Sequence, residues 1–180
     1  SMKFSIKFND LQNQYKLIKN EIDTAIKSVL DDSVFIGGKY LKEFEINFAK
    51  YLNLNHCVGV ANGTDALEIA IEALQLPKES EIIVPANSFI SSAEAVSRNG
   101  HKVIFCDINP YDYNINIEDI KKRITKNTSA IIAVHLYGQP CEIDKLIEIS
   151  KTFKLKIIED CAQAHGATYK GKKVGSIGDI

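Results

Sequence analysis

The apolar residues near the N-terminus follow a helical period. Between positions 11 and 29 they recur at intervals of three and four, which places them on one face of a helix. These residues are Leu11, Tyr15, Ile18, Ile22, Ile26 and Val29. After a flexible joint at Gly37-Gly38, a second helix is expected to have a buried face made of Leu41, Phe44, Phe48 and Tyr51. We therefore assign residues 1–52 to an N-terminal helical segment.

From residue 53 onward, short continuous apolar runs alternate with helical stretches. The predicted strands are residues 56–60, 81–84, 102–107, 129–135 and 155–159, the predicted helices are residues 65–74, 90–98, 117–123 and 142–153, and a small turn or hairpin is expected at residues 169–174. Continuous apolar runs are typical of strands buried on both faces, and their alternation with helices implies parallel strands joined by right-handed crossovers. The predicted fold class is therefore α/β, with a mostly parallel sheet flanked by helices. Binding sites in such sheets lie at the carboxyl ends of the strands.

Composition and charge exclude several classes of protein. The chain has 180 residues, of which 45% are apolar and 25% are charged, as in an ordinary globular domain. Its net charge of -1 gives no reason to expect binding to nucleic acid or to an anionic membrane. The apolar runs are too short to span a bilayer, and the N-terminus lacks an apolar signal core. The four cysteines are far apart and form no C-x-x-C pair, which argues against a zinc site or a disulfide framework and favours reduced thiols in a cytoplasmic protein.

The first segment that could carry chemistry is residues 60–67, where a strand is expected to end and a helix to begin. Gly63 permits a tight turn, the free amides of a helix N-terminus bind phosphate well, and Thr64 adds a hydroxyl. An ordinary helix start, with Thr64 or Asp65 as the N-cap, explains the segment equally well. The segment matches neither G-x-G-x-x-G nor a Walker motif.

Two further strand ends carry residues suited to a site. In residues 85–89, Phe89 would stand over a ligand at the edge of the sheet and stack on a planar ring. The alternative is a core phenylalanine at the start of a helix. In residues 135–140, polar groups and a Gly-Gln-Pro turn suit a site loop, and the alternative is a strand-to-helix turn with a buried, hydrogen-bonded His135.

The fourth segment, residues 157–166, ends a buried apolar strand with two acids, Glu159 and Asp160. Burying a carboxylate is costly unless it is paired or hydrogen-bonded, so a partner brought by a ligand is indicated. Gln163 follows three residues later and would reach the same pocket. Two alternatives remain at this point, namely that the acids cap the next element or face solvent. A metal site formed by Asp160, His165 and Glu159 is a further option, although the spacing matches no standard zinc or iron pattern.

Taken together, these segments resemble the DegT/DnrJ/EryC1/StrS family of sugar aminotransferases, which are fold-type-I enzymes that depend on pyridoxal 5'-phosphate (PLP). The matching stretches occur in the order of the family, at residues 35–38, 44–45, 62–67, 84–89, 134–139, 159–166 and 175–179. The resemblance covers nearly the whole chain after about Phe8. One such motif would be weak, but the full ordered set is specific.

The resemblance implies roles for individual residues. Gly63 and Thr64 match part of the cradle for the PLP phosphate, and Phe89 matches an aromatic residue that stacks on the pyridine ring. Asp160 matches the aspartate that pairs with the pyridine nitrogen, and Gln163 matches a residue beside the ring hydroxyl. No role is assigned to the neighbouring residues Glu159, His165, His135 and Tyr137.

The resemblance also implies parts that this chain does not contain. In the family, the residues matching 178–180 are followed by a strand with a phosphate-binding serine and then by the lysine that binds PLP covalently. The chain stops at Ile180, so no catalytic residue is assigned in it, and Lys170, Lys172 and Lys173 fit an exposed turn better. Residues 53–180 are thus expected to form a PLP-binding α/β large domain truncated before the catalytic lysine, with the C-terminal small domain missing. The full-length protein is expected to be an enzyme, whereas the chain alone lacks the lysine.

The activity implied by the resemblance is transfer of an amino group from L-glutamate to a nucleotide-linked keto sugar in amino-sugar biosynthesis. A dTDP-linked keto-6-deoxyhexose is favoured as the acceptor, and a homodimer with shared active sites is expected. A PLP-dependent sugar 3-dehydratase of the same family, in which histidine replaces the lysine, is one alternative. An inactive ligand-binding or regulatory relative is another. A nucleotide-binding dehydrogenase would need a glycine fingerprint after the first strand, which the sequence lacks.

Overall fold

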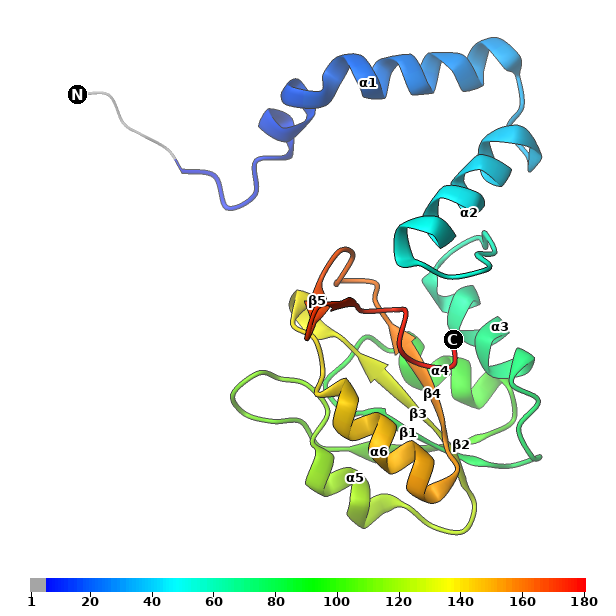
Figure 1. Ribbon diagram of the computed structural model, residues 1–180, viewed down its shortest axis with the longest axis vertical. Coiled ribbons are helices and arrows are strands. Elements are labelled where there is room, and N and C mark those ends of the chain that lie inside the picture. Colours follow the sequence, from blue (N-terminus) through cyan, green and yellow to red (C-terminus); the bar gives the residue numbers. More distant parts are fainter. Residues whose placement is uncertain (1–5) are drawn as a thin grey trace. The chain divides into compact units, whose positions relative to one another are not determined.

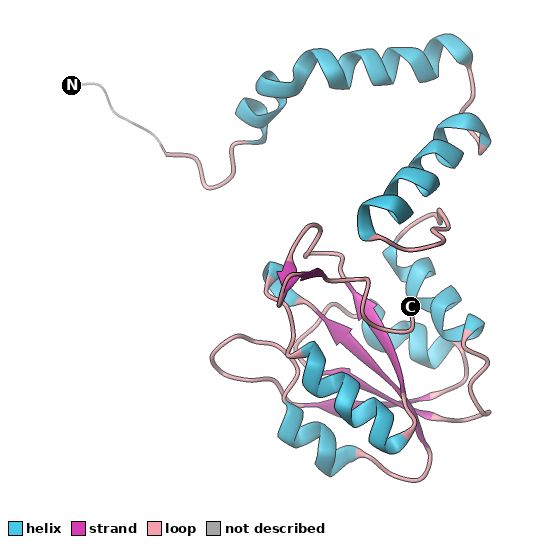
Figure 2. Cartoon of the chain, in the orientation of Figure 1, coloured by secondary structure: helices cyan, strands magenta, loops and turns pink. Residues whose placement is uncertain are grey.

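The structure, a computed structural model, describes residues 6–180. The chain divides into two compact units, Ser1–Phe48 and Ala49–Ile180. The first unit is helical, and the second contains all of the described strands together with the remaining helices (Figures 1 and 2). The candidate site lies wholly within the second unit.

Two helices account for most of the first unit. Helix α1 spans Leu11–Asp32, and helix α2 spans Gly38–Leu52 and so extends into the second unit. The side chain of Asp10 caps α1 by accepting a hydrogen bond from the Asn13 amide at 3.1 Å. Ser33 ends α1 in the left-handed conformation, with φ at 53°. Both helices predicted in this region are confirmed.

The buried face predicted for α2 is wrong. No residue of α1 is buried, and in α2 only Ala49 is buried among the residues that the structure describes. Leu41, Phe44 and Tyr51 are 38%, 53% and 47% exposed. An apolar helical face becomes buried only where a second layer packs against it. No helix in the described chain is long and apolar enough to cross a bilayer.

The second unit is built on a four-stranded sheet with the strand order β2-β1-β3-β4, in which all neighbouring strands are parallel (Figure 1). The strands are β1 (Glu81–Pro85), β2 (Lys102–Cys106), β3 (Thr128–Val134) and β4 (Lys156–Asp160). Each boundary lies within one residue of the prediction. The predicted parallel α/β architecture is therefore confirmed.

The strand predicted at residues 56–60 is wrong. A strand requires a neighbouring backbone to pair with, and this segment pairs with none of the described strands. Val58 and Val60 are 75% and 39% exposed, so the apolar run that suggested a buried strand is not buried. The segment is instead an irregular connection between α2 and the next helix.

Helices cover both faces of the sheet (Figures 1 and 2). Helices α3 (Gly63–Ala73) and α4 (Ser91–Arg98) pack on one face, and α5 (Ile117–Arg123) and α6 (Ile143–Phe153) pack on the other. Successive strand residues alternate between these layers, so Ile158 packs with α3 and α4 while Ile157 packs with α5 and α6. All four predicted helices of this unit are confirmed. Because apolar residues fill both faces of the sheet, only its ends remain for polar chemistry.

The chain after β4 turns back and runs beside this strand. The strands β5 (Thr168–Tyr169) and β6 (Lys172–Lys173) form the predicted antiparallel hairpin. Beyond the hairpin, the Glu159 amide donates to the Ile180 carbonyl at 2.8 Å, and the Asp179 amide donates to the Ile157 carbonyl at 2.8 Å. These bonds use the edge of β4 that faces away from β3, and they hold residues 179–180 against it.

The two-sided burial of the sheet predicts a large loss of stability when β3 is truncated. Ile132 of β3 is fully buried, so Ile132→Ala is expected to lower the free energy of unfolding by about 2–5 kcal/mol through lost apolar contact and a residual cavity. Urea unfolding followed by circular dichroism measures the loss. The matched control is Ile69→Ala, because Ile69 on α3 is 50% exposed, and a loss below about 1 kcal/mol is expected there. Equal losses at the two positions would contradict the described burial.

Candidate functional site

A cavity of about 460 Å³ lies at the carboxyl ends of the strands. It is lined by Asn62, Gly63, Thr64, Leu67, Ser88, Phe89, Ser91, Val134, Leu136, Asp160, Ala162 and Gln163. The chain passes from β1 to β2 on one side and then to β3 on the other, so the strand order reverses between β1 and β3. Open α/β sheets bind ligands at such a point. The structure thus brings together all five residues for which the sequence predicted cofactor contacts, although they come from three separate connections.

One wall of the cavity is the N-terminal turn of α3. The Asn62 side chain caps this helix by accepting a hydrogen bond from the Asp65 amide at 2.9 Å. The predicted cap, Thr64 or Asp65, is therefore wrong by two or three positions, because Asn62 supplies the extended backbone that a cap requires. The amides of Gly63 and Thr64, at the first helical positions, have no acceptor within the helix. They leave this turn with unpaired donors and a positive dipole end, which suit an anion.

Hydroxyl groups gather at the same wall. The Thr64 and Ser91 hydroxyl oxygens lie 2.7 Å apart, and those of Ser88 and Ser92 lie 2.8 Å apart. Ser91 and Ser92 begin α4, so the first turns of two helices contribute to one hydroxyl cluster. Sequence reasoning missed Ser88 and Ser91. The available signal was their position in the turn after the strand that ends at Pro85, where a parallel sheet places its ligand contacts.

Phe89 follows the same strand and is 75% exposed at the rim of the cavity. The alternative reading, a core phenylalanine at the start of a helix, is therefore wrong. An exposed aromatic face beside a cavity offers a surface on which a planar ligand can stack. Its predicted role in stacking stays a prediction.

Asp160 and Gln163 form the opposite wall, after β4. The Asp160 Oδ1 atom accepts a hydrogen bond from the Ala162 amide at 3.0 Å, which fixes the side chain in a tight turn. The Gln163 Oε1 atom accepts from the Tyr137 amide at 2.7 Å. Because a backbone N–H group can only donate, the atom it meets is the side-chain oxygen, and the side-chain NH2 group of Gln163 remains as a donor. The wall therefore offers a carboxylate and an amide donor to a ligand.

The connection that holds Gln163 has an unusual backbone. Tyr137 has φ of 56° and ψ of 19°, in the left-handed region that disfavours a side chain. A Cβ atom at Gly138 would lie 3.2 Å from the Gln163 carbonyl oxygen, and φ is also positive at this glycine. These features bring the connection close to Gln163. Strained backbone of this kind is concentrated at functional sites.

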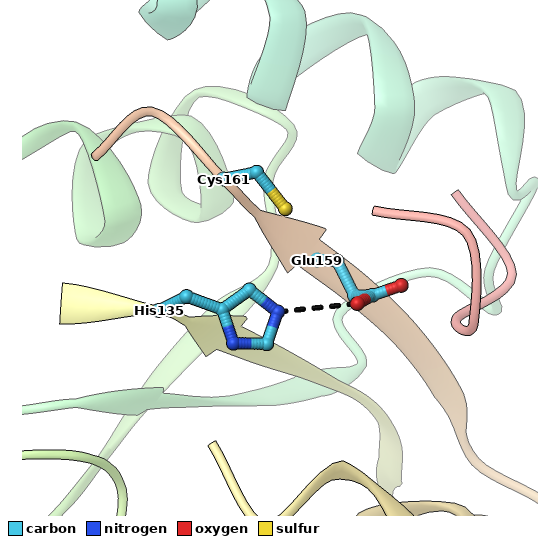
Figure 3. Close-up of side chains that lie close together, drawn as sticks. All are labelled: His135, Glu159 and Cys161. Atoms are coloured by element: carbon cyan, nitrogen blue, oxygen red, sulfur yellow. Dashed lines mark hydrogen bonds and ion pairs between the residues drawn. The ribbon is translucent and has the colours of Figure 1, made fainter. Parts of the chain in front are cut away.

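The two consecutive acids at the end of β4 point to opposite faces of the sheet. Asp160 lines the cavity on the side of α3, whereas the Glu159 side chain is only 1% exposed and lies beneath the chain that follows β6. Figure 3 shows Glu159 beside His135 at the end of β3. The sequence alternatives for Glu159, a cap or a solvent-facing acid, are therefore wrong.

Four donors converge on the Glu159 carboxylate. Oε1 accepts from His135 Nε2 at 3.1 Å and from the Gly175 amide at 2.9 Å. Oε2 accepts from the Ile177 amide at 2.8 Å and from the Gly178 amide at 2.7 Å. Burial alone would raise the pKa of Glu159, but these hydrogen bonds outweigh burial and hold its pKa below the usual value. The residue is therefore ionised at neutral pH inside the protein.

His135 is fully buried, and its tautomer follows from its partners. The Cys141 amide donates to Nδ1 at 2.9 Å, so that nitrogen is unprotonated and Nε2 carries the hydrogen that Glu159 receives. This confirms the alternative reading of His135 as a buried, hydrogen-bonded residue in a strand-to-helix turn.

The metal set considered from sequence, Asp160, His165 and Glu159, is not the one that the fold brings together. Instead the ligand atoms of His135, Glu159 and Cys161 lie within 4.8 Å of one another (Figure 3). Both ring nitrogens and both carboxylate oxygens of this set already have hydrogen-bond partners. Burial also raises the pKa of the Cys161 thiol to about 12, whereas a metal ligand must be a thiolate. The geometry favours a hydrogen-bonded structural cluster over a metal centre.

The sequence and the fold are similar to those of known proteins. The sequence profile of the DegT/DnrJ/EryC1/StrS aminotransferase family matches residues 16–180. The dTDP-3-amino-3,6-dideoxy-alpha-D-galactopyranose transaminase of Aneurinibacillus thermoaerophilus is 44% identical over 174 residues, which cover 97% of this chain and 48% of that protein. The chain therefore spans about half the length of this relative.

Two solved structures extend the comparison to the fold. S. venezuelae DesV superposes with a TM-score of 0.89 at 38% identity, covering 95% of this chain and 46% of that chain. The E. coli GDP-4-keto-6-deoxy-D-mannose-3-dehydratase, solved with bound hydrated PLP, superposes with a TM-score of 0.81 at 34% identity, covering 97% of this chain and 44% of that chain. The resemblance and the fold class predicted from the sequence are confirmed.

The lowered pKa of Glu159 predicts a pH-dependent contribution to stability. A carboxyl group with a lowered pKa in the folded state stabilises the fold above its unfolded pKa of about 4.3, and this contribution is lost as the pH falls toward the folded pKa. Glu159→Gln is therefore expected to cost about 2–4 kcal/mol at neutral pH, with a smaller difference from wild type below about pH 4. Urea unfolding at a series of pH values measures this difference.

The control for this experiment is Glu148→Gln, which makes the same chemical change at an exposed position on α6. It is expected to unfold as the wild type does at each pH. A difference between wild type and Glu159→Gln that stays constant with pH would show that ionisation of Glu159 does not stabilise the fold.

Proposed function

The chain belongs to the DegT/DnrJ/EryC1/StrS aminotransferase family, and from this membership we propose that the full-length protein uses PLP to transfer an amino group from L-glutamate to a nucleotide-linked keto sugar. One observation carries the proposal. The residues that the resemblance assigns to the cofactor come from separate connections of the sheet and line a single cavity. The chain spans about half the length of the relative it matches, so the proposal concerns the full-length protein.

The cavity fits the chemistry of PLP. Its volume of about 460 Å³ suits a small cofactor, since ligand pockets measure about 300–1,000 Å³. The hydroxyl groups of Thr64 and Ser91 and the first amides of α3 suit a phosphate group. Phe89 offers an aromatic face for the pyridine ring, and Asp160 offers a carboxylate to its protonated nitrogen. The side-chain NH2 group of Gln163 can donate a hydrogen bond to an oxygen substituent on the ring.

When bound, PLP supplies an electron sink for the carbon whose bonds are broken. The residues of this chain would set the conditions for that chemistry. A carboxylate at Asp160 favours the protonated form of a ring nitrogen beside it, because an opposite charge stabilises the cation. Phe89 would cover one face of the ring and exclude water from it. The rigid turn at Ala162 holds Asp160 in place before a ligand arrives, which avoids reorganisation during the reaction.

The finer parts of the proposal concern the substrates and the assembly. We infer a dTDP-linked keto-6-deoxyhexose as the acceptor, and the similarity to a dTDP-amino-sugar transaminase supports this choice. L-glutamate is the proposed amino donor, and a homodimer is the proposed assembly. The similarity to a 3-dehydratase structure keeps dehydration as the second outcome to be tested.

The proposed function is tested first by the absorbance of the full-length protein with added PLP, before and after L-glutamate. The long-wavelength band of covalently bound PLP, lost when glutamate is added, would support amino transfer. PLP binding without that band would point to the dehydratase. No binding of PLP would overturn the cofactor assignment and leave a regulatory, ligand-binding relative. Mass spectrometry of products formed from dTDP-, UDP- and GDP-linked keto sugars then identifies the acceptor.

The hydroxyl cluster predicts that Thr64 recognises the phosphate and not the ring. Thr64→Val keeps the shape of the side chain but removes its hydroxyl, which costs a charged hydrogen bond of about 1.5–3 kcal/mol. In the full-length protein, the affinity for PLP is therefore expected to fall about 10- to 150-fold. Pyridoxal, which lacks the phosphate, should bind wild type and variant equally. An equal loss for both ligands would show that Thr64 acts only on the structure of the site.

Asp160 is expected to act on the ring nitrogen. Asp160→Asn keeps the size of the side chain and the hydrogen bond to Ala162 but removes the charge. We expect amino transfer in the full-length protein to fall on the order of 100-fold, which corresponds to about 3 kcal/mol of lost ion pairing. Single-turnover kinetics with glutamate measure the effect. A loss of less than about threefold would contradict this role.

A further inference from the structure

Glu159 is a buried, charged residue next to the cavity, yet it does not line it. Taking an ionised carboxylate out of water is costly unless several hydrogen bonds compensate. The fold supplies four donors to this one group, from segments that are far apart in the sequence. Such a concentration of contacts on a group with no access to the ligand indicates a role in holding other parts of the site.

The first part that Glu159 holds is the chain after β6. The amides of Gly175, Ile177 and Gly178 all donate to its carboxylate. The approach is close enough to require glycine, since a Cβ atom at Gly178 would lie 2.9 Å from the Ile157 carbonyl oxygen. This docking brings residues 179–180 into hydrogen bonding with the free edge of β4.

The second part is the connection between β3 and α6, which Glu159 holds through His135. The two ring nitrogens of His135 link the Glu159 carboxylate to the Cys141 amide. The His135 amide donates to the Asp160 carbonyl at 3.1 Å. The same connection carries the Tyr137 amide, which binds Gln163. The backbone of Asp160 is therefore one hydrogen bond away from His135, and the Gln163 side chain is one hydrogen bond away from Tyr137, two residues further along the same connection.

We propose that Glu159 and His135 form a positioning brace, which fixes Asp160 and Gln163 relative to residues 175–180 without touching the ligand. The proposal rests on the proposed function, because it concerns the same cavity. The alternation of side chains along β4 allows one short segment to contribute both to the cavity and to the brace. Asp160 faces the cavity, and its neighbour Glu159 anchors the chain on the opposite face of the sheet.

A carboxylate is required in this brace because every partner is a donor. Its two oxygens accept two hydrogen bonds each. The glutamine side chain has one carbonyl oxygen and one NH2 group. At position 159 the NH2 group would face two N–H donors, from which it cannot accept hydrogen bonds. Glu159→Gln therefore breaks at least two of the four bonds and keeps nearly the same volume.

The brace is tested in the full-length protein by comparing wild type, Glu159→Gln and the exposed control Glu148→Gln. Hydrogen exchange without cofactor is expected to be at least about tenfold faster in Glu159→Gln at residues 175–178 and 135–141, which corresponds to about 1.4 kcal/mol. At a temperature well below unfolding, the affinity for PLP is expected to fall about tenfold and the absorption maximum of bound PLP to shift. Glu148→Gln is expected to match wild type in each measurement.

The brace has two arms, namely the contacts of Glu159 with residues 175–178 and those of His135 with residues 135–141. A second variant tests them separately and remains informative if Glu159→Gln does not fold. Glutamine at position 135 can place its side-chain NH2 group where His135 Nε2 lies, but its single carbonyl oxygen then does not occupy the position of Nδ1, so the acceptor for the Cys141 amide is lost. His135→Gln is therefore expected to speed exchange at residues 135–141 while residues 175–178 exchange as in wild type. Equal acceleration of both segments would contradict two separate arms.

A purely structural role gives a different result. In that case Glu159→Gln lowers the unfolding temperature, but the folded variant binds PLP with the affinity and spectrum of wild type, and the positioning proposal is overturned. Failure of the wild type to bind PLP would instead overturn the proposed function. The exchange measurement still tests the brace in that event. Unchanged exchange at residues 175–178 and 135–141 would overturn it, and faster exchange would support it.

Discussion

The parallel sheet is covered by helices on both faces, and this constraint decides where polar groups can lie. The strands are filled with apolar residues that alternate between the two helical layers. A charged side chain inside either layer would lose its hydration, so polar chemistry is confined to the ends of the strands. The carboxyl ends of β1, β3 and β4 meet at the cavity, and the first turn of α3 adds its unpaired amides there.

The same alternation governs the two consecutive acids at the end of β4. Because neighbouring residues of a strand point to opposite faces, Glu159 and Asp160 cannot share one environment. Asp160 lies at the cavity, and Glu159 lies among four donors on the other side. One short stretch of sequence thus contributes to the site and to the structure that supports it.

The sequence allowed the strands and helices of the second unit to be predicted because each has a clear apolar period and clear ends. The strand expected at residues 56–60 failed since apolar content alone does not provide a pairing partner. Five of the twelve residues that line the cavity were predicted, through the family resemblance and through their positions at strand ends. Ser91 was missed, because its contact with Thr64 joins residues that are 27 positions apart. The partners of Glu159 lie 16 to 24 positions away and depend on the path of the chain after β6, which no local pattern reveals.

The docking of residues 175–180 on β4 has a consequence for the cooperativity of folding. The sheet and its four helices involve residues before position 161, so they could assemble while the later segment is still unbound. In such a partly folded state, Glu159 would lack three of its four donors, but its carboxylate would be hydrated because the segment that covers it is also unbound. Docking of residues 175–180 therefore removes the charge from water in the same step that supplies its donors, so a partly docked state, with the charge covered and donors missing, is unfavourable at neutral pH. The charge thus works against partially folded states as well as in favour of the native one.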